Sequence, residues 1–465
     1  MAFGGLYISI SGINANKRAL DTVSHNIANV NNPSYVRQSA IHATNGYVTT
    51  QVGGHEMGTG VHVEEIRQIR DEFIDVRFRR ELGIYGYHYA KADILNEVEM
   101  IFNDLSDSGL QNVMNNFWSS WSELYKEPDS LTLRGLVHES AVAFTQTVNH
   151  IDMQLDNLQR NLNKEILNKV EEVNGLLKDI SDLNGKIKMA EGGGPNIKAN
   201  DFKDMRNEKL DKFSKLIPIT YYEKNTGEIA VTLQGRDLVN GDYINPIDIQ
   251  TDNRGYGYIH WKDTGDKIEL GEKGELGGYI AVRDSIDVEY RVKLNALVST
   301  IASEINTIHE SGKDLEENTG TKFFVPTDGE ITAGNIKVNP DLSNFNKIAV
   351  SKSGAKGDGE IIKDILQLRE KGFKELENTT FDDFYRDLVD IIGIEGRKAK
   401  SIASNQAVLL KQIEDRKGSI SSVSLDEEMT LMLQYQHSYI ANSRVVNAID
   451  EMMENIVNRM GVVGR

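Results

Sequence analysis

Residue types that often carry out catalysis are present, but they do not stand in catalytic patterns. The sequence has ten histidines and no cysteine, so disulfides and thiolate metal sites are excluded. His309-Glu310 is followed by Ser, Gly and Lys, so the second histidine of a His-Glu-x-x-His zinc motif is missing. The sequence contains neither a Gly-x-x-x-x-Gly-Lys-Ser/Thr phosphate loop nor a Gly-x-Ser-x-Gly turn. No motif therefore indicates an enzyme, although catalytic groups can lie far apart in a sequence.

Two further segments could suggest a ligand, and neither has the required context. Residues 354–359 are rich in glycine but lack the strand-then-helix pattern of a phosphate site, so they predict a loop. Asp328-Gly329-Glu330 lacks the alternating ligand spacing of a calcium loop. Seventy acidic residues make chance pairs of carboxylates inevitable. We therefore predict no catalytic residue, no cofactor and no metal.

Composition limits the partners. The formal net charge of −18 argues against nucleic acid, whose phosphates would repel such a surface. No segment approaches the ~20 apolar residues that a membrane helix needs. The first six residues lack the basic region of a secretory signal, and no long apolar run follows them, so a cleaved signal peptide is not expected. Composition alone would place the protein in the cytoplasm.

Two stretches at opposite ends of the chain carry a seven-residue repeat. In residues 6–30 and 432–460, one set of residues recurs every seven positions, and a second set follows three positions later. A strict repeat of this kind describes a seam that winds around another helix. We predict that the two stretches pair as a coiled coil whose seam serves assembly. The seam residues are Leu6, Ile13, Asn16, Leu20, Val23, Ile27 and Val30, together with Met432, Tyr435, Tyr439, Asn442, Val446, Ile449, Met453, Ile456 and Met460.

The alternative is two ordinary amphipathic helices, each docked on a separate core. Opposite charges favour pairing, because residues 1–46 are net positive and residues 425–465 are net negative. Asn16 and Asn442 both fall on the second set of positions, where a buried amide can fix the register of two helices.

The middle of the chain reads mainly as helix. Apolar residues at helical spacing predict helix through most of residues 68–189, with a nearly unbroken stretch at 131–189 that ends before Gly192. Further helices are expected at 276–311, 359–369 and 381–414. A hairpin is predicted at 219–233 around Asn225-Thr226-Gly227. Short strands are predicted at 256–261, 267–270, 336–338 and 348–350.

These elements predict a mainly α fold with three parts. Residues 1–65 and 419–465 form a terminal coiled-coil domain. Residues 66–315 and 372–418 form a rod-like bundle of long helices, with a β-hairpin region near 217–270. Residues 316–371 form a small outer β-rich insertion.

Both ends also resemble a known family. Ser11-Gly12-Ile13-Asn14-Ala15 and the segment from Asn26 to Asn31 resemble the opening signature of the axial proteins of the bacterial flagellum. The family usually has Thr and Gly where this chain has Asn32 and Ser34. Leu425-Asp426-Glu427-Glu428-Met429 resembles its closing signature. In that family the two ends pair into a coiled coil that lines a tubular filament.

Internal segments resemble the hook-associated branch of this family, namely residues 200–210 and 306–324. The resemblance implies a structural subunit of the hook–filament junction, outside the cell and exported by the flagellar type III route without a cleaved signal. It implies contacts with further copies, the hook protein and the next junction protein (hook-associated protein 3), and an export chaperone at the C-terminal helix. The alternatives are a rod or hook subunit, or an extracellular enzyme or glycan-binding domain carried on residues 200–370.

Overall fold

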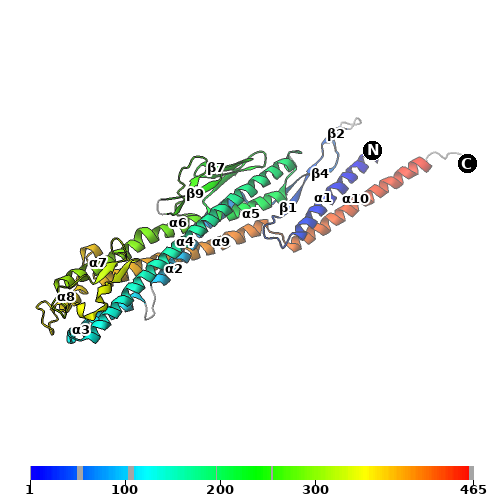
Figure 1. The fold of residues 1–465 in the computed structure, drawn as a ribbon. Coiled ribbons are helices and arrows are strands. Elements are labelled where there is room, and N and C mark those ends of the chain that lie inside the picture. The colour runs from blue at the N-terminus through cyan, green and yellow to red at the C-terminus, as the bar shows by residue number, and fades with distance from the viewer. Residues whose placement is uncertain (1, 50–55, 103–108, 195, 253–254, 460–465) are drawn as a thin grey trace.

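The protein is an elongated molecule with both chain ends at one extremity (Figure 1). A computed structural model describes residues 2–49, 56–102, 109–194, 196–252 and 255–459. Two terminal helices lie side by side at that extremity, and a longer helical rod extends away from them. Long helices dominate and the sheets are small, so the predicted mainly α class is confirmed.

The terminal part contains two helices and two β-ladders. Helix α1 (Ala2–Ala28) packs against α10 (Leu425–Arg459) on one side and against two strands on another. α1 ends shortly before Pro33, which lacks a backbone N–H and disfavours helix in the residue before it. Strand β1 (Gln38–Thr44) pairs antiparallel with β4 (Val61–Gln68), and β2 (Tyr47–Thr49) pairs antiparallel with β3 (Glu56–Gly58).

The rod is built on three long helices. α4 has 61 residues and is about 90 Å long at 1.5 Å per residue. It begins after Pro128 and ends at Gly192, with apolar residues at spacings of three and four between these breaks. The long helices are α2 (Glu72–Phe102), α4 (Leu131–Glu191) and α9 (Phe381–Ser421). The shorter ones are α3 (Leu110–Lys126), α5 (Asn200–Leu216), α6 (Glu275–Ser285), α7 (Arg291–Ser311) and α8 (Glu360–Leu368), with a π-helical turn at Ile286–Tyr290 joining α6 to α7.

A small β-region covers one side of the rod near the terminal part (Figure 1). Its four-stranded antiparallel sheet has the order β5-β6-β7-β8, and a separate hairpin pairs β9 with β10. Gly227, with φ of +79°, makes the turn between β5 and β6. Buried side chains of these strands share one core with α4 and α5. The strands are β5 (Thr220–Glu223), β6 (Ile229–Leu233), β7 (Arg236–Asn240), β8 (Tyr243–Ile244), β9 (Ile247–Thr251) and β10 (Gly257–Trp261).

The end of the rod away from the termini holds the larger core. Phe323 and Phe324 pack there against Phe117 and Trp121 of α3. Residues 316–371 contain one antiparallel pair, α8 and short 3-10 turns, and their buried side chains belong to the same core as the long helices. The pair is β11 (Phe324–Pro326) with β12 (Ile336–Val338), and the 3-10 turns of this end are Pro340–Ser343, Phe345–Lys347 and Lys374–Leu376.

Most of the predicted elements are present with shifted ends. The helices predicted at 131–189, 359–369 and 381–414 correspond to α4, α8 and α9, and the hairpin at 219–233 corresponds to β5 and β6. The strand predicted at 348–350 is wrong, because these buried residues form no strand and only the next residue, Ser351, makes an isolated bridge, to Lys313. The strand predicted at 267–270 is likewise reduced to a bridge between Lys267 and His260.

Candidate assembly interface

The two terminal helices run antiparallel in a constant register. A Cβ added at Gly12 would lie 2.8 Å from Asn442 Oδ1, and one added at Gly5 would lie 3.2 Å from Ile449 Cδ1. Seven residues farther along α1, Ala19 is buried where Tyr435 packs. Each step of seven along α1 therefore matches a step of seven backwards along α10. The line of closest approach on α1 carries Gly and Ala, which let the two backbones come close together.

On α1, the predicted seam residues flank this line or lie on it. Val23 is buried, and Asn16 is half-buried with its Nδ2 donating to the backbone oxygen of Gly12 at 2.7 Å. The larger apolar residues Leu6, Ile13, Leu20 and Ile27 are all half-buried, and so is Val30, which lies beyond the helix because α1 ends at Ala28. Sequence reasoning placed the seam on these large side chains and missed Gly5, Gly12 and Ala19. The seven-residue recurrence of small residues was the signal that could have revealed them.

On α10, some of the predicted seam residues are covered and others are exposed. Ile449 is buried, and Met432, Tyr435, Asn442, Val446 and Met453 are half-buried toward α1. Tyr439 is 37% exposed and Ile456 is 52% exposed. Met460 lies outside the described residues.

The amides of Asn16 and Asn442, which fall where a buried amide can fix register, each bond to their own helix. Asn442 Nδ2 donates to Ser438 O at 2.9 Å. A different amide, that of Asn26, donates to Glu428 Oε2 on α10 at 2.9 Å, and both residues are buried. Arg37 donates to the other oxygen of Glu428 at 2.7 Å and so compensates its buried charge. These polar contacts join α1, α10 and the segment before β1 at the end of the helix pair nearest the rod.

The charge complementarity noted in the sequence is used in part within one chain, because Arg37, between α1 and β1, pairs with Glu427 and Glu428 of α10, both at 2.7 Å. Among the ion pairs of the described residues, none joins a side chain of α1 to one of α10. Lys17 and Arg18 on α1 are exposed, as is Asp426 on α10. These three charges therefore remain available on the surface.

The first turns of α5 hold the terminal part to the rod. Asp204 accepts hydrogen bonds from Val36 N–H at 3.1 Å and from Gln68 Nε2 at 2.6 Å. Asn200 Nδ2 donates to Ile66 O at 2.9 Å. α5 therefore bonds to Val36, which precedes β1, and to Ile66 and Gln68 of β4. Burial raises the pKa of Asp204 to about 7, with Arg70 acting in the opposite direction. This joint was not predicted from the sequence.

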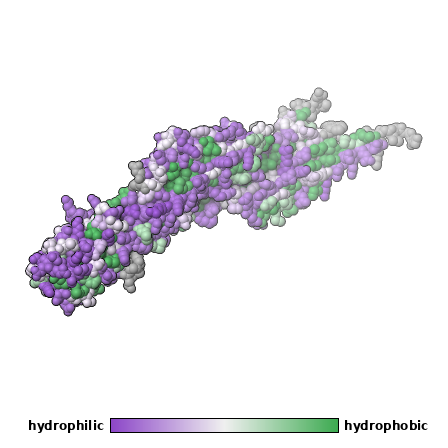
Figure 2. Space-filling model, viewed as in Figure 1, coloured by the Kyte–Doolittle hydropathy of each residue, from purple (hydrophilic) through white to green (hydrophobic). Residues whose placement is uncertain are grey.

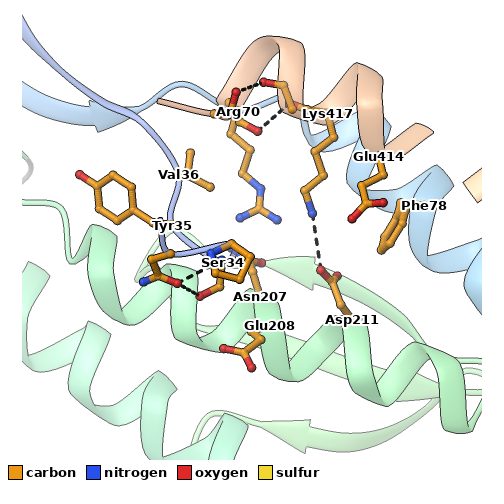
Figure 3. A pocket seen from close by; sticks show the side chains of 15 residues that line it. Ser34, Tyr35, Val36, Arg70, Phe78, Asn207, Glu208, Asp211, Glu414 and Lys417 are labelled. Atoms are coloured by element: carbon orange, nitrogen blue, oxygen red, sulfur yellow. Dashed lines mark hydrogen bonds and ion pairs between the residues drawn. The ribbon is translucent and has the colours of Figure 1, made fainter. Parts of the chain in front are cut away.

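A cavity of about 560 Å³ lies under the turn that joins α1 to β1 (Figure 3). Arg70 and Lys417 point into it, and Asp211 faces Lys417 with its carboxylate 3.5 Å from the ammonium nitrogen. Lys417 also pairs with Asp75 at 3.1 Å. Glu208 and Glu414 line the same space. Because its lining mixes cations with carboxylates, we assign this cavity no ligand. Above the cavity, the turn is held by hydrogen bonds of the joint such as that from Val36 N–H to Asp204.

The histidine and glycine segments considered for chemistry have structural partners. His309 is buried, with Nδ1 bonded to Thr321 O and Nε2 accepting from Ala349 N–H at 2.8 Å. Asp358 fixes the glycine-rich loop by accepting from the backbone N–H of Ser353 and Glu360. Within the described ranges, no group of three or more His, Asp or Glu side chains could hold a metal ion. In the same part of the chain, no helix has the length and apolar character needed to cross a membrane.

Comparisons with known proteins match both ends and the middle of the chain. Residues 6–35 match the family model "Flagella basal body rod protein", and residues 419–460 match "Flagellar basal body rod FlgEFG protein C-terminal". Residues 95–324 match "Flagellar hook-associated protein FlgK helical domain". The two terminal segments therefore match models of basal body rod proteins, whereas the long helical part of this chain matches the FlgK model.

Whole-chain relatives agree with these matches. Flagellar hook-associated protein 1 of Bacillus subtilis (strain 168) is 30% identical over 505 residues, covering 100% of this chain and 99% of that protein. The protein of the same name from Salmonella typhimurium is 23% identical, covering 97% and 98% of the two chains. The flagellar hook junction protein FlgK from Burkholderia pseudomallei has the same fold, with a TM-score of 0.63, 13% identity and coverage of 75% of this chain and 100% of that one. On these grounds the chain belongs to the flagellar hook-associated protein 1 family, whose members are structural components of the external flagellum and not enzymes.

Proposed function

We propose that this chain is a structural subunit of the hook–filament junction and that it assembles through α1 and α10. The names of its relatives place them with the hook, and the Burkholderia neighbour is a hook junction protein. The match of residues 95–324 to the FlgK helical domain favours this branch over a rod or hook subunit. Among the described residues of 200–370, no feature favours an enzyme or a glycan-binding domain.

The observation that carries the proposal is the apolar outer face of α10. Leu425, Met429, Leu433 and Ile440 are exposed, and their spacings of four, four and seven put them on one side of the helix. The opposite side of α10 faces α1, since Asn442 and Ile449 lie there. Figure 2 shows hydrophobic surface along the terminal helices. Contiguous exposed apolar surface of this kind marks a site of contact with another protein.

The seam is also proposed to contact neighbouring copies. Tyr439 and Ile456 are exposed beside the residues that pack on α1, so they are available to a second chain. Lys17 and Arg18 on α1 would pair between copies with Asp426, Asp450 and Glu451 of α10, because these exposed side chains, unlike Glu427 and Glu428, make no ion pair among the described residues. The seam is thus proposed to have an inner part that pairs α1 with α10 and an outer part that joins subunits.

We propose that the chain contacts further copies of itself, the hook protein on one side and hook-associated protein 3 on the other. Before assembly, the exposed face of α10 would be covered by an export chaperone, because a free apolar stripe invites aggregation. Export would proceed without a cleaved signal.

The test replaces two outer residues of α10 and leaves its inner face intact. Leu433→Ser with Ile440→Ser removes apolar surface that is exposed in the single chain, so the monomer should keep its melting temperature. Assembly should fail, seen as loss of filaments beyond the hook and loss of swimming. The matched control is Val408→Ser, which removes an exposed apolar side chain from α9 of the rod. Normal filaments with the double variant would rule out α10 as the joining surface.

A further inference from the structure

A small cavity beside α2 carries positive charge without any carboxylate. It has a volume of about 250 Å³ and lies between α2, the segment that follows α5, and β5. Arg79, Arg80 and Lys273 line it, and no acidic residue does. This is unusual in a chain with 70 acidic and 52 basic residues. The cavity therefore favours a negatively charged occupant.

Two of the three cations are free to meet such an occupant. Arg79 is already committed, because its Nε donates to Asp211 at 2.6 Å and its guanidinium lies over the ring of Tyr221. Arg80 is exposed and has only a 3.5 Å contact with Glu81. Lys273 is exposed and makes no ion pair among the described residues. A ligand carboxylate would meet Arg80 and Lys273 at the mouth of the cavity.

The remaining walls of the cavity are largely apolar. Val76 is 51% exposed, and Ile219 and Tyr221 are half-buried. The volume lies below the ~300–1,000 Å³ of small-molecule pockets, and it suits one or two side chains of a protein partner. An adjoining cavity of about 640 Å³ shares Val76, Arg79 and Tyr221 with it, so an occupant could continue along α2. The expected ligand is an acidic segment that also carries apolar side chains.

The beginning of α10 has this chemistry. Leu425 and Met429 are exposed on one side of the helix, and Met429 is 58% exposed. Asp426 and Glu427 lie in the same turn, and Asp426 makes no ion pair among the described residues. α10 of the same chain does not line the cavity. Because Glu427 and Glu428 already pair with Arg37, the side chains left for a second copy are Leu425, Asp426 and Met429.

We propose that the cavity formed by Val76, Arg80, Ile219 and Lys273 receives the first two turns of α10 of a second copy. Leu425 or Met429 enters between Val76 and Ile219, and Asp426 meets Arg80 and Lys273. The inference rests on the proposed function in one respect, namely that copies of this chain lie next to one another. It adds a contact between the terminal helix of one subunit and the rod of the next.

The experiment measures binding of a peptide to the full chain. The probe is a fluorescently labelled, end-capped peptide of residues 423–434, and fluorescence anisotropy reports binding at chain concentrations below self-assembly. Arg80→Glu with Lys273→Glu should weaken binding roughly tenfold, because two attractive charges become repulsive. The matched control is Lys322→Glu with Lys374→Glu, which changes the net charge equally at two exposed lysines elsewhere. Thermal melting checks that both variants remain folded.

Two altered peptides separate the charge from the apolar contact. Peptides with Asp426→Lys and Glu427→Lys, or with Leu425→Ser and Met429→Ser, should each bind at least several-fold more weakly than the native sequence. Equal weakening by the two charge variants of the chain would overturn the proposal, as would insensitivity to loss of Leu425 and Met429. No binding up to about 1 mM peptide would also overturn it. Because the assay needs no assembly, its failure leaves the proposed role of the outer face of α10 standing.

Discussion

The rod and the terminal helix pair are stabilised in different ways. The rod buries Trp121, Phe117, Phe144 and Phe323 in one core, and each such aromatic side chain removes about 150–250 Å² from water. The buried cluster of the terminal part consists of Ala15, Ala19, Ala40 and Val63. The rod therefore has a core of its own, whereas the terminal pair leaves much of its apolar surface on the outside. We therefore expect the rod to fold on its own and the terminal pair to be completed by neighbouring chains.

The largest expected effect comes from separating α1 and α10 at their closest approach. Gly12→Val places a branched side chain where a Cβ alone would lie 2.8 Å from Asn442 Oδ1, so the helices must move apart. Assembly should be abolished while the rod melts at the wild-type temperature. Electron microscopy of flagella and thermal melting of the purified chain measure the two outcomes.

The control for this variant is Gly185→Val in α4. A Cβ at Gly185 meets nothing within 4 Å, so valine there should leave assembly intact. If Gly12→Val also lowered the melting temperature of the rod, the two regions would be one cooperative unit and the contrast drawn above would fail.

A second prediction removes part of the rod core. Trp121 is 0% exposed and contacts Phe117 and Phe323, so Trp121→Ala should lower the free energy of unfolding by about 3–5 kcal/mol. The indole Nε1 has no hydrogen-bond partner among the described residues, so Trp121→Phe should cost much less. Urea unfolding of both variants gives the values. A loss below about 1 kcal/mol for alanine would mean that this core does not hold the rod.

A third prediction uses pH to weaken the rod alone. Burial lowers the pKa of His309 from 6.5 to about 4, and its neutral ring bonds both Thr321 and Ala349. A folded pKa below the ordinary one gives stability that is present above pH 6.5 and lost as the pH falls toward 4. The loss should be on the order of 3 kcal/mol. Comparing urea unfolding of wild type and His309→Gln at pH 7 and 4.5 isolates this contribution; equal pH dependence in the two proteins would contradict it.

The sequence predicted the helices well because their signals are local. In α4, apolar residues recur at spacings of three and four without an interior Pro, and the prediction of 131–189 missed only the last two residues. Strands β7 and β9 were missed because Arg236–Asn240 and Ile247–Thr251 are short and mix polar with apolar residues. The π-helical turn at Ile286–Tyr290 has no signature in the spacing of its residues.

The assembly site was only partly predictable for a related reason. A search for hydrophobic residues finds Leu6, Ile13 and Leu20, but two helices approach each other most closely where their side chains are small. The register of α1 against α10 is therefore set by Gly5 and Gly12, each of which immediately precedes a predicted seam residue. The joint could not be predicted, because Asp204 bonds Val36 and Gln68, which are far from it in the sequence.

The last prediction concerns this joint and has the opposite pH dependence to the rod. The pKa of Asp204 is raised to about 7 by burial, above the ordinary value of 3.8. Its contribution is therefore fully present below about pH 4 and is lost as the pH rises through 7. Opening of the joint should be easier at pH 8 than at pH 5, by up to about a hundredfold in the protection factor of the Val36 amide.

Hydrogen exchange at the two pH values, corrected for intrinsic rates, measures this local opening without reporting the rod. Asp204→Asn keeps the shape of the side chain and removes its titration, so the difference between pH 5 and pH 8 should vanish at Val36. The amides of α4 provide the internal reference, because they lie in the rod. If Val36 became better protected at pH 8, hydrogen bonding to the ionised carboxylate would outweigh its burial. The terminal part would then be held to the rod more firmly in base, contrary to the sign expected from the raised pKa.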